Sequence, residues 1–304
     1  MKNRKYSLVF IMLLCMIMAV SAFPMTVNAD MGPKASVRIQ FEHMGDELCY
    51  GTLLSKEKST GPASAWDGRT ESAQKEYMDP GIWEIFVTYK DPDGYYFLQR
   101  SWKVSESKEL AWTYYPPDDF KILLYYPETE TFVSSGIYAR YAFDTYYTVD
   151  MDGVDIGSVE YNDDLSTNER IEAYRSYNYR QEMLALGARI VLTILIEMLV
   201  ALLFGFRQKK QLLILAVVNI ITQIILNVLL NVINYNSGPL AFTFFYVLFE
   251  LIVFALEAVL YCTILKRISE KKKEDAYYIL YSFVANLISF GAGLFLAAKL
   301  PGMF

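Results

Sequence analysis

Histidine is nearly absent from this sequence, which has a single one, His43, among 304 residues. Zinc proteases that cut inside membranes, and membrane proteases that combine two glutamates with a histidine, need imidazole groups in their apolar segments. The apolar segments of this chain contain no histidine, and the sequence has no Gly-x-Ser-x-Gly or nucleotide-binding glycine motif. We therefore expect no catalytic residue, no metal and no cofactor, and an enzyme ranks last among the functional classes.

Cysteine is also scarce, with Cys15, Cys49 and Cys262. Cys15 and Cys262 lie in apolar segments, so Cys49 has no partner for an intramolecular disulfide in the polar half of the chain. Burial is the common state of such a thiol, and a bridge to another molecule is the alternative. His43 precedes Cys49 by six residues, but without a third orienting residue the pair does not predict a thiol nucleophile.

Apolar residues are abundant: they make up 54% of the chain and are concentrated after Gly187. This composition predicts a membrane protein in contact with the lipid bilayer. Near the start, three basic residues precede the apolar run 6–23, and small residues follow at 27–29. We expect a signal peptide over residues 1–29, cleaved before Asp30. The alternative is an uncleaved anchor, which leaves the next segment on the same side of the membrane.

Residues 30–165 are expected to form an extracytoplasmic β-rich, sandwich-like domain. Acidic residues clearly outnumber basic ones between Asp30 and Glu182, which argues against nucleic acid as a partner. One helix is expected, capped by Asp79 and with Pro80 in its first turn. Alternating and β-branched runs predict strands at 36–41, 48–54, 120–126, 131–134 and 139–149, with a hairpin turn at 127–130.

Aromatic and acidic groups in this domain allow two further interpretations. The tyrosine pairs 95/96, 114/115, 125/126 and 146/147 could form a ligand platform, but strand alternation predicts one ring of each pair in the core and one outside. The carboxylates at 150–155, with Asp163 and Asp164, are of the kind that binds calcium, but they do not match the EF-hand spacing. A solvated, turn-rich linker is the preferred interpretation of this segment.

A juxtamembrane helix is expected over 166–185. Ser166 and Glu169 have the spacing of a capping box, and no proline or glycine follows before Gly187. This helix is expected to begin near Thr167 and to run without a break into the first membrane segment. It would then couple the outer domain mechanically to the membrane.

Residues 186–304 are expected to form a four-helix transmembrane bundle, with spans at 186–206, 211–234, 240–265 and 277–298. Basic residues follow the first and third spans, whereas the loop between the second and third is uncharged. The positive-inside rule therefore predicts that the N-terminal domain and the C-terminus are both extracytoplasmic.

Polar side chains interrupt these apolar segments at helical spacing. Such groups are costly in a bilayer unless they face each other, a cavity or another protein. The face is open to three interpretations: hydrogen bonds that hold the helices together, an ion or solute pathway, or a docking face for another membrane subunit. The candidate site residues are Glu197, Asn219, Gln223, Asn227, Asn231, Asn234, Glu250, Glu257 and Asn286.

Glu250 has no basic residue predicted at its depth, since Arg189 is expected near the outer surface. We expect Glu250 to be protonated at neutral pH and hydrogen-bonded to Gln223 or Asn227.

Several stretches resemble a set of uncharacterised bacterial multipass membrane proteins: Ala188–Glu197, Val218–Asn227, Phe249–Tyr261, Tyr114-Tyr-Pro-Pro and Tyr141–Asp144. The resemblance implies a bacterial cell-membrane setting and the architecture above, and it implies no activity. The leading functional hypothesis is a non-enzymatic binding, sensing or accessory protein that couples an extracytoplasmic ligand, or another membrane subunit, to the bundle. The alternative is a small permease, or permease subunit, that uses Glu250 and Glu257.

Overall fold

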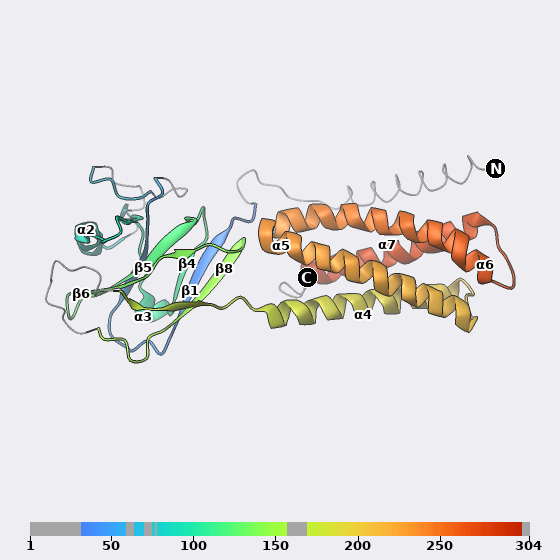
Figure 1. The fold of residues 1–304 in the computed structure, drawn as a ribbon, viewed down its shortest axis with the longest axis horizontal. Coiled ribbons are helices and arrows are strands. Elements are labelled where there is room, and N and C mark those ends of the chain that lie inside the picture. The colour runs from blue at the N-terminus through green and yellow to red at the C-terminus, as the bar shows by residue number, and fades with distance from the viewer. Residues whose placement is uncertain (1–31, 59–63, 70–74, 77, 157–168, 300–304) are drawn as a thin grey trace. The chain divides into compact units, whose positions relative to one another are not determined.

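The computed structural model describes residues 32–58, 64–69, 75–76, 78–156 and 169–299 (Figure 1). The chain divides into two compact units, one of which is Pro33–Tyr177 and is rich in strands. The other contains all the long helices and begins at Asn178. The expected signal peptide lies outside the described residues.

The first sheet of the N-terminal unit has four strands in the order β10-β8-β1-β4. Its central strand β1 pairs in parallel with β8 and antiparallel with β4. The strands are β1 (Ser36–Glu42), β4 (Glu109–Trp112), β8 (Asp144–Asp150) and β10 (Ala173–Arg175).

The second sheet follows the order β3-β2-β5-β6-β9, with β7 (Tyr138–Ala139) beside β5. Its strands are β2 (Tyr50–Ser55), β3 (Tyr96–Phe97), β5 (Asp119–Tyr126), β6 (Thr131–Ser135) and β9 (Glu169–Ile171). Tyr126 pairs with Thr131 across the turn at 127–130, which confirms the predicted hairpin. The predicted strand 139–149 is divided into β7 and β8 by a break at 140–143.

The two sheets share one apolar core, as a sandwich does. Ile39 and Trp112 of the first sheet join Ile122 and Leu124 of the second in a single buried cluster. On the other side of the second sheet lies α2 (Pro80–Thr88), whose Phe86 packs on that face. The predicted helix is confirmed together with its cap, because the Asp79 carboxylate accepts the Gly81 N–H at 2.9 Å. A second, short helix is α3 (Val104–Ser107).

Both faces of β5 are covered, which buries both members of one tyrosine pair. Tyr126 points into the core between the sheets and Tyr125 toward α2, so both rings are buried and the prediction for this pair is wrong. It is right for the pair 146/147, in which Tyr147 is buried and Tyr146 is exposed. The same holds for the pair 95/96.

The predicted juxtamembrane helix 166–185 is wrong. Ser166 lies outside the described residues, but residues 169–175 form β9 and β10, and the helix α4 begins only at Tyr179. Asn178 caps it by accepting the Gln181 N–H at 3.0 Å. Burial of Ile171 in the core and the ladder between β10 and β8 outweigh the local helix signal. An unbroken helical connection therefore does not exist.

The helical unit consists of α4 (Tyr179–Leu203), α5 (Lys209–Leu260), a π turn η3 (Tyr261–Leu265), α6 (Lys266–Ile268) and α7 (Asp275–Lys299). Three helical stretches are long and apolar enough to cross a membrane: Tyr179–Leu203, Lys209–Ile268 and Asp275–Phe295.

The longest of them, α5, folds back on itself at Gly238. This residue has φ 80° and ψ −178°, a conformation that glycine adopts, and Pro239 follows. Thr222 and Glu257 are hydrogen-bonded at 3.0 Å, whereas an unbroken helix would hold residues 35 apart at about 50 Å. Residues 209–237 are therefore called the first arm and 239–260 the second arm, and they lie side by side in Figure 1.

Candidate functional site

The polar residues of the bundle turn inward from all four helical segments. Glu197 on α4 and Asn286 on α7 are fully buried, and Glu257 on the second arm is as well. On the first arm, by contrast, apolar residues such as Ile221 and Ile225 point outward. The buried polar set also includes Asn219, Gln223, Asn227 and Glu250, whereas Asn231 and Asn234 are half-buried.

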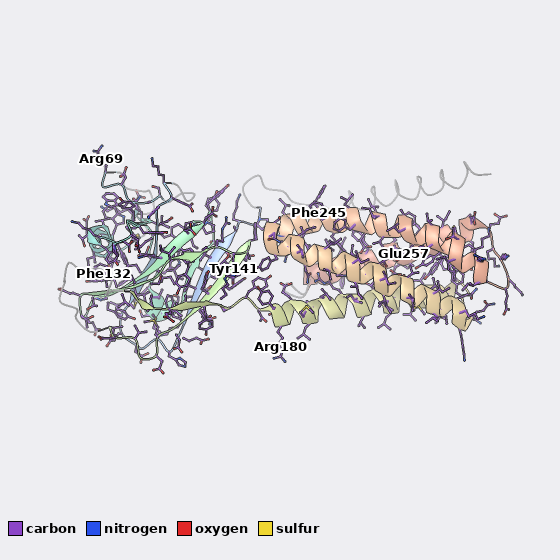
Figure 2. The ribbon with its side chains drawn as sticks, viewed as in Figure 1. Arg69, Phe132, Tyr141, Arg180, Phe245 and Glu257 are labelled. Carbon is purple, nitrogen blue, oxygen red and sulfur yellow. The ribbon has the colours of Figure 1, made fainter. Side chains whose placement is uncertain are left out.

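Glu257, which is labelled in Figure 2, accepts a hydrogen bond at each of its carboxyl oxygens. Thr222 donates to its Oε1 at 3.0 Å, and the Asn286 amide donates to its Oε2 at 2.7 Å. One turn further, the Tyr261 hydroxyl donates to Asn219 at 2.7 Å. Both carboxyl oxygens of Glu257 are therefore satisfied, and this part of the polar face ties three helical segments together.

Glu197 is held more loosely. The Ser289 hydroxyl of α7 lies 3.4 Å from its Oε1, and its Oε2 is buried without a hydrogen-bond partner. The same Ser289 hydroxyl lies 3.1 Å from the Asn286 carbonyl oxygen. A hydroxyl has one proton to donate, so Ser289 can serve only one of these acceptors at a time.

A cavity of about 80 Å³ lies beside Glu250. All four helical segments line it, and its polar wall residues are Arg189, Thr193, Gln223, Asn227, Thr243, Tyr246, Glu250 and Ser289. Oε2 of Glu250 and Nε2 of Gln223 are among the buried atoms of this wall that have no hydrogen-bond partner. One is an acceptor and the other is a donor, so the wall offers both kinds of hydrogen bond.

The hydrogen bond expected from Glu250 to Gln223 or Asn227 does not form. The Asn227 amide donates instead to Gln223 on its own arm, at 2.8 Å to the carbonyl oxygen and 3.2 Å to Oε1. The Tyr246 hydroxyl faces the Glu250 carboxyl from one turn away. Side-chain rotamers decide these pairings, and helical periodicity does not predict them.

Arg189 is a buried residue of the bundle that the candidate list did not include. It is 9% exposed, donates to Asn231 at 2.9 Å and lies 5.8 Å from the Phe242 ring centre. It shares the cavity wall with Glu250. Arg189 is eight residues from Glu197, so both lie on one side of α4. This spacing could have predicted that Arg189 faces the polar interior.

Aromatic rings close the bundle at the end where α7 begins. Phe206 packs against Tyr277, Tyr278 and Tyr281 of α7 at centroid distances of 5.0 to 5.9 Å. Leu215 of the first arm lies in the same cluster and is fully buried. Beyond the rings, Gln211 donates to Ser269 at 2.9 Å. Packed aromatic rings and one buried polar pair therefore lie between the polar interior and this end of the bundle.

The N-terminal unit does not assemble the alternative sites considered from sequence. Cys49 is fully buried, and burial raises the pKa of its thiol to about 12, so it is a poor nucleophile. His43 pairs with Asp150 at 2.8 Å, and this carboxylate raises the pKa of the imidazole. Within the described ranges, no three His, Cys, Asp or Glu side chains converge as metal ligands would. Asp163 and Asp164 lie outside those ranges.

Comparison with protein-family models, with curated proteins and with solved structures found no match to this chain. The resemblance to a bacterial multipass family therefore stays a prediction.

Proposed function

We propose that this chain crosses the cell membrane four times, through α4, the two arms of α5, and α7. Each arm has the length that a bilayer of about 30 Å requires. The basic residues around Lys209 and Lys272 belong to the same end of the bundle, since Gln211 and Ser269 are bonded there. The turn at Gly238 is uncharged. The positive-inside rule then gives an extracytoplasmic N-terminal domain, in keeping with a signal peptide and a bacterial cell membrane.

We further propose that the bundle binds a small polar solute or ion beside Glu250, as a small permease or permease subunit would. The observation that carries this is the pair of unpartnered buried atoms, Glu250 Oε2 and Gln223 Nε2, on one cavity wall. The carboxyl of Glu257 differs, because both of its oxygens accept hydrogen bonds within the bundle. Groups left unpaired beside a cavity are suited to an occupant.

Cysteine labelling tests this proposal on the full-length protein in a cysteine-free background. Asn227→Cys lines the cavity, and Val228→Cys faces outward as its matched control. Thr193→Cys on α4 provides a second cavity position, with Leu195→Cys as its control. A permease should allow a charged, membrane-impermeant thiol reagent to reach both cavity cysteines from right-side-out and from inverted vesicles.

The outward controls should not react, because a thiol in lipid does not ionise. Labelling of the cavity cysteines from one side only would argue for a binding pocket without transport and against a permease. Cavity cysteines that react no faster than the controls would refute the site itself.

A sensing role for the N-terminal domain is the second candidate. One observation favours it: only residues 176–178 separate β10 from α4, and Ser176 still donates its backbone N–H to Tyr146 at 3.0 Å. A change in the sheet would reach α4 through this short connection. In a sensing protein, destabilising the N-terminal domain should change the rate at which Asn227→Cys is labelled. Insertion of six Gly and Ser residues into the connection should abolish that change. If domain destabilisation leaves labelling unchanged in the uninserted chain, this coupling does not exist.

A further inference from the structure

Glu250 and Glu197 reach the same small cavity by different routes. Glu250 has its unpartnered Oε2 in the cavity wall. Glu197 lies behind Ser289, a wall residue whose hydroxyl oxygen is 3.4 Å from Glu197 Oε1 and can turn its proton from the Asn286 carbonyl to this carboxyl. A cavity of about 80 Å³ with polar partners can hold several waters, since one needs roughly 10–15 Å³ on this measure. Water in the cavity would connect Glu250 with the Ser289 hydroxyl, and this hydroxyl lies beside Glu197.

We propose that the ion bound at this site is a proton, with Glu250 as its first acceptor and Glu197 as its second. This rests on the proposed function, because it identifies what the cavity at Glu250 takes up. A hydronium in the cavity gives its proton to Glu250 Oε2 and leaves water behind. When Glu250 ionises again, cavity water carries the proton to Ser289 Oγ, and Ser289 gives its own proton to Glu197 Oε1. Ser289 is neutral before and after.

Other occupants fit the wall less well. A metal cation needs several oxygen ligands around it, and among the described residues the acidic side chains do not converge in this way. A bound anion would be repelled by the Glu250 carboxylate in the same wall. A proton needs one unpartnered carboxyl oxygen, and both Glu250 and Glu197 have one.

Glu257 is excluded from this series by its own hydrogen bonds. Thr222 and Asn286 already occupy both of its oxygens. It is therefore the matched control: a carboxyl in the same bundle and equally buried, but without access to the cavity. The charged and titratable groups that face Glu250 or Glu197 are Arg189 from α4, Tyr246, Glu257 and Tyr261 from the α5–η3 segment, and Tyr281 from α7.

Infrared difference spectroscopy on the purified full-length protein tests the assignment. Two protonated-carboxyl bands should change when the pH is stepped, one lost in Glu250→Gln and the other in Glu197→Gln. Glu250→Asp and Glu197→Asp should each restore a shifted band, which separates loss of the group from loss of the fold. Glu257→Gln should leave both bands in place. Ser289→Ala should slow the response of the Glu197 band while that of Glu250 is unchanged.

Sodium and potassium chloride, added at constant pH, serve as the cation probes. No band should change with either salt. A band of Glu250 that responds to sodium or potassium, or bands that ignore pH, would overturn the proton assignment. Failure of the cavity cysteines to label would count against the proposed permease site without affecting these spectra, so the two failures are distinguishable.

Discussion

Lys121 lies in the middle of β5, on the face that α2 covers, and its side chain is fully buried. Its ammonium is 3.1 Å from Asp91 and 2.5 Å from Asp93. The Asp91 carboxyl is also fully buried, whereas Asp93 is 45% exposed. Lys121→Met would keep the apolar stem and remove the charge, so the main effect is to leave the Asp91 carboxylate buried without its cation.

Removal of one member of a buried ion pair costs about 3–5 kcal/mol. Asp91 keeps two backbone donors after the change, the N–H groups of Asp93 and Tyr95 at 3.0 and 3.2 Å. The loss should therefore lie near the lower limit, at about 3 kcal/mol of unfolding free energy. The exposed Asp93 partner adds less than about 1 kcal/mol, because solvent screens it. Adding Asp91→Asn to Lys121→Met should recover at least half of the loss, since the amide oxygen still accepts both N–H groups and has no charge.

Tryptophan fluorescence measures this in the intact protein. All four tryptophans, Trp66, Trp83, Trp102 and Trp112, belong to the N-terminal unit, so a denaturant titration in detergent reports the unfolding of that unit. Lys103→Met is the control, because its pair with Glu106 is exposed and screened by solvent. If Lys121→Met costs no more than Lys103→Met, the buried pair does not stabilise the sandwich and the reasoning fails.

Three further outcomes are expected. Because burial raises the pKa of the Cys49 thiol to about 12, the unfolded chain loses this proton first as pH rises above the usual value of 9.0. Unfolding free energy should then fall more steeply with pH in wild type than in Cys49→Ala, and equal slopes would contradict the burial. Gly238→Ala forces a side chain into a conformation reserved for glycine and should cost about 1–3 kcal/mol in helix melting, whereas Gly291→Ala, with open space around it, should be neutral. Glu257→Gln should melt like wild type, and Glu257→Leu should lose about 1–3 kcal/mol because its donors are left unpaired; equal melting of the two variants would show that the network is not stabilising.

Local signals predicted much of the N-terminal unit. Asp79 and Pro80 mark the start of α2 through cap chemistry that acts within one turn, and the turn at 127–130 defines the hairpin in the same way. The segment after Ser166 was predicted wrongly because its sequence satisfies a helix locally. The strand β10 forms only because β8, more than twenty residues earlier, offers it an edge. Pairings of this kind depend on where distant strands end in space, which no window of sequence contains.

Helical periodicity predicted which side chains of the bundle share a face, as the buried polar residues on α5 show. The helix itself determines which residues share a face, so this does not depend on how neighbouring helices pack. Periodicity could not predict how those groups pair. Asn227 was expected to serve Glu250 but bonds to Gln223 on its own arm. Arg189 was predicted by its depth near the outer membrane surface, and periodicity did not predict that it bonds to Asn231 inside the bundle. Both outcomes depend on rotamers and on the position of α4 against α5.

The polar face has two parts, one around Glu257 and one around Glu250, and they differ in how well their carboxyl groups are hydrogen-bonded. A buried donor or acceptor left unpaired costs about 1–3 kcal/mol, so Glu250 Oε2 and Gln223 Nε2 together remove stability that a leucine at either position would not. The network around Glu257 shows that this helix set can satisfy a buried carboxyl completely. Packing therefore accounts for Glu257 and not for Glu250. An occupant that bonds to both unpaired atoms would return the lost free energy on binding, so the cavity is most stable when it is filled.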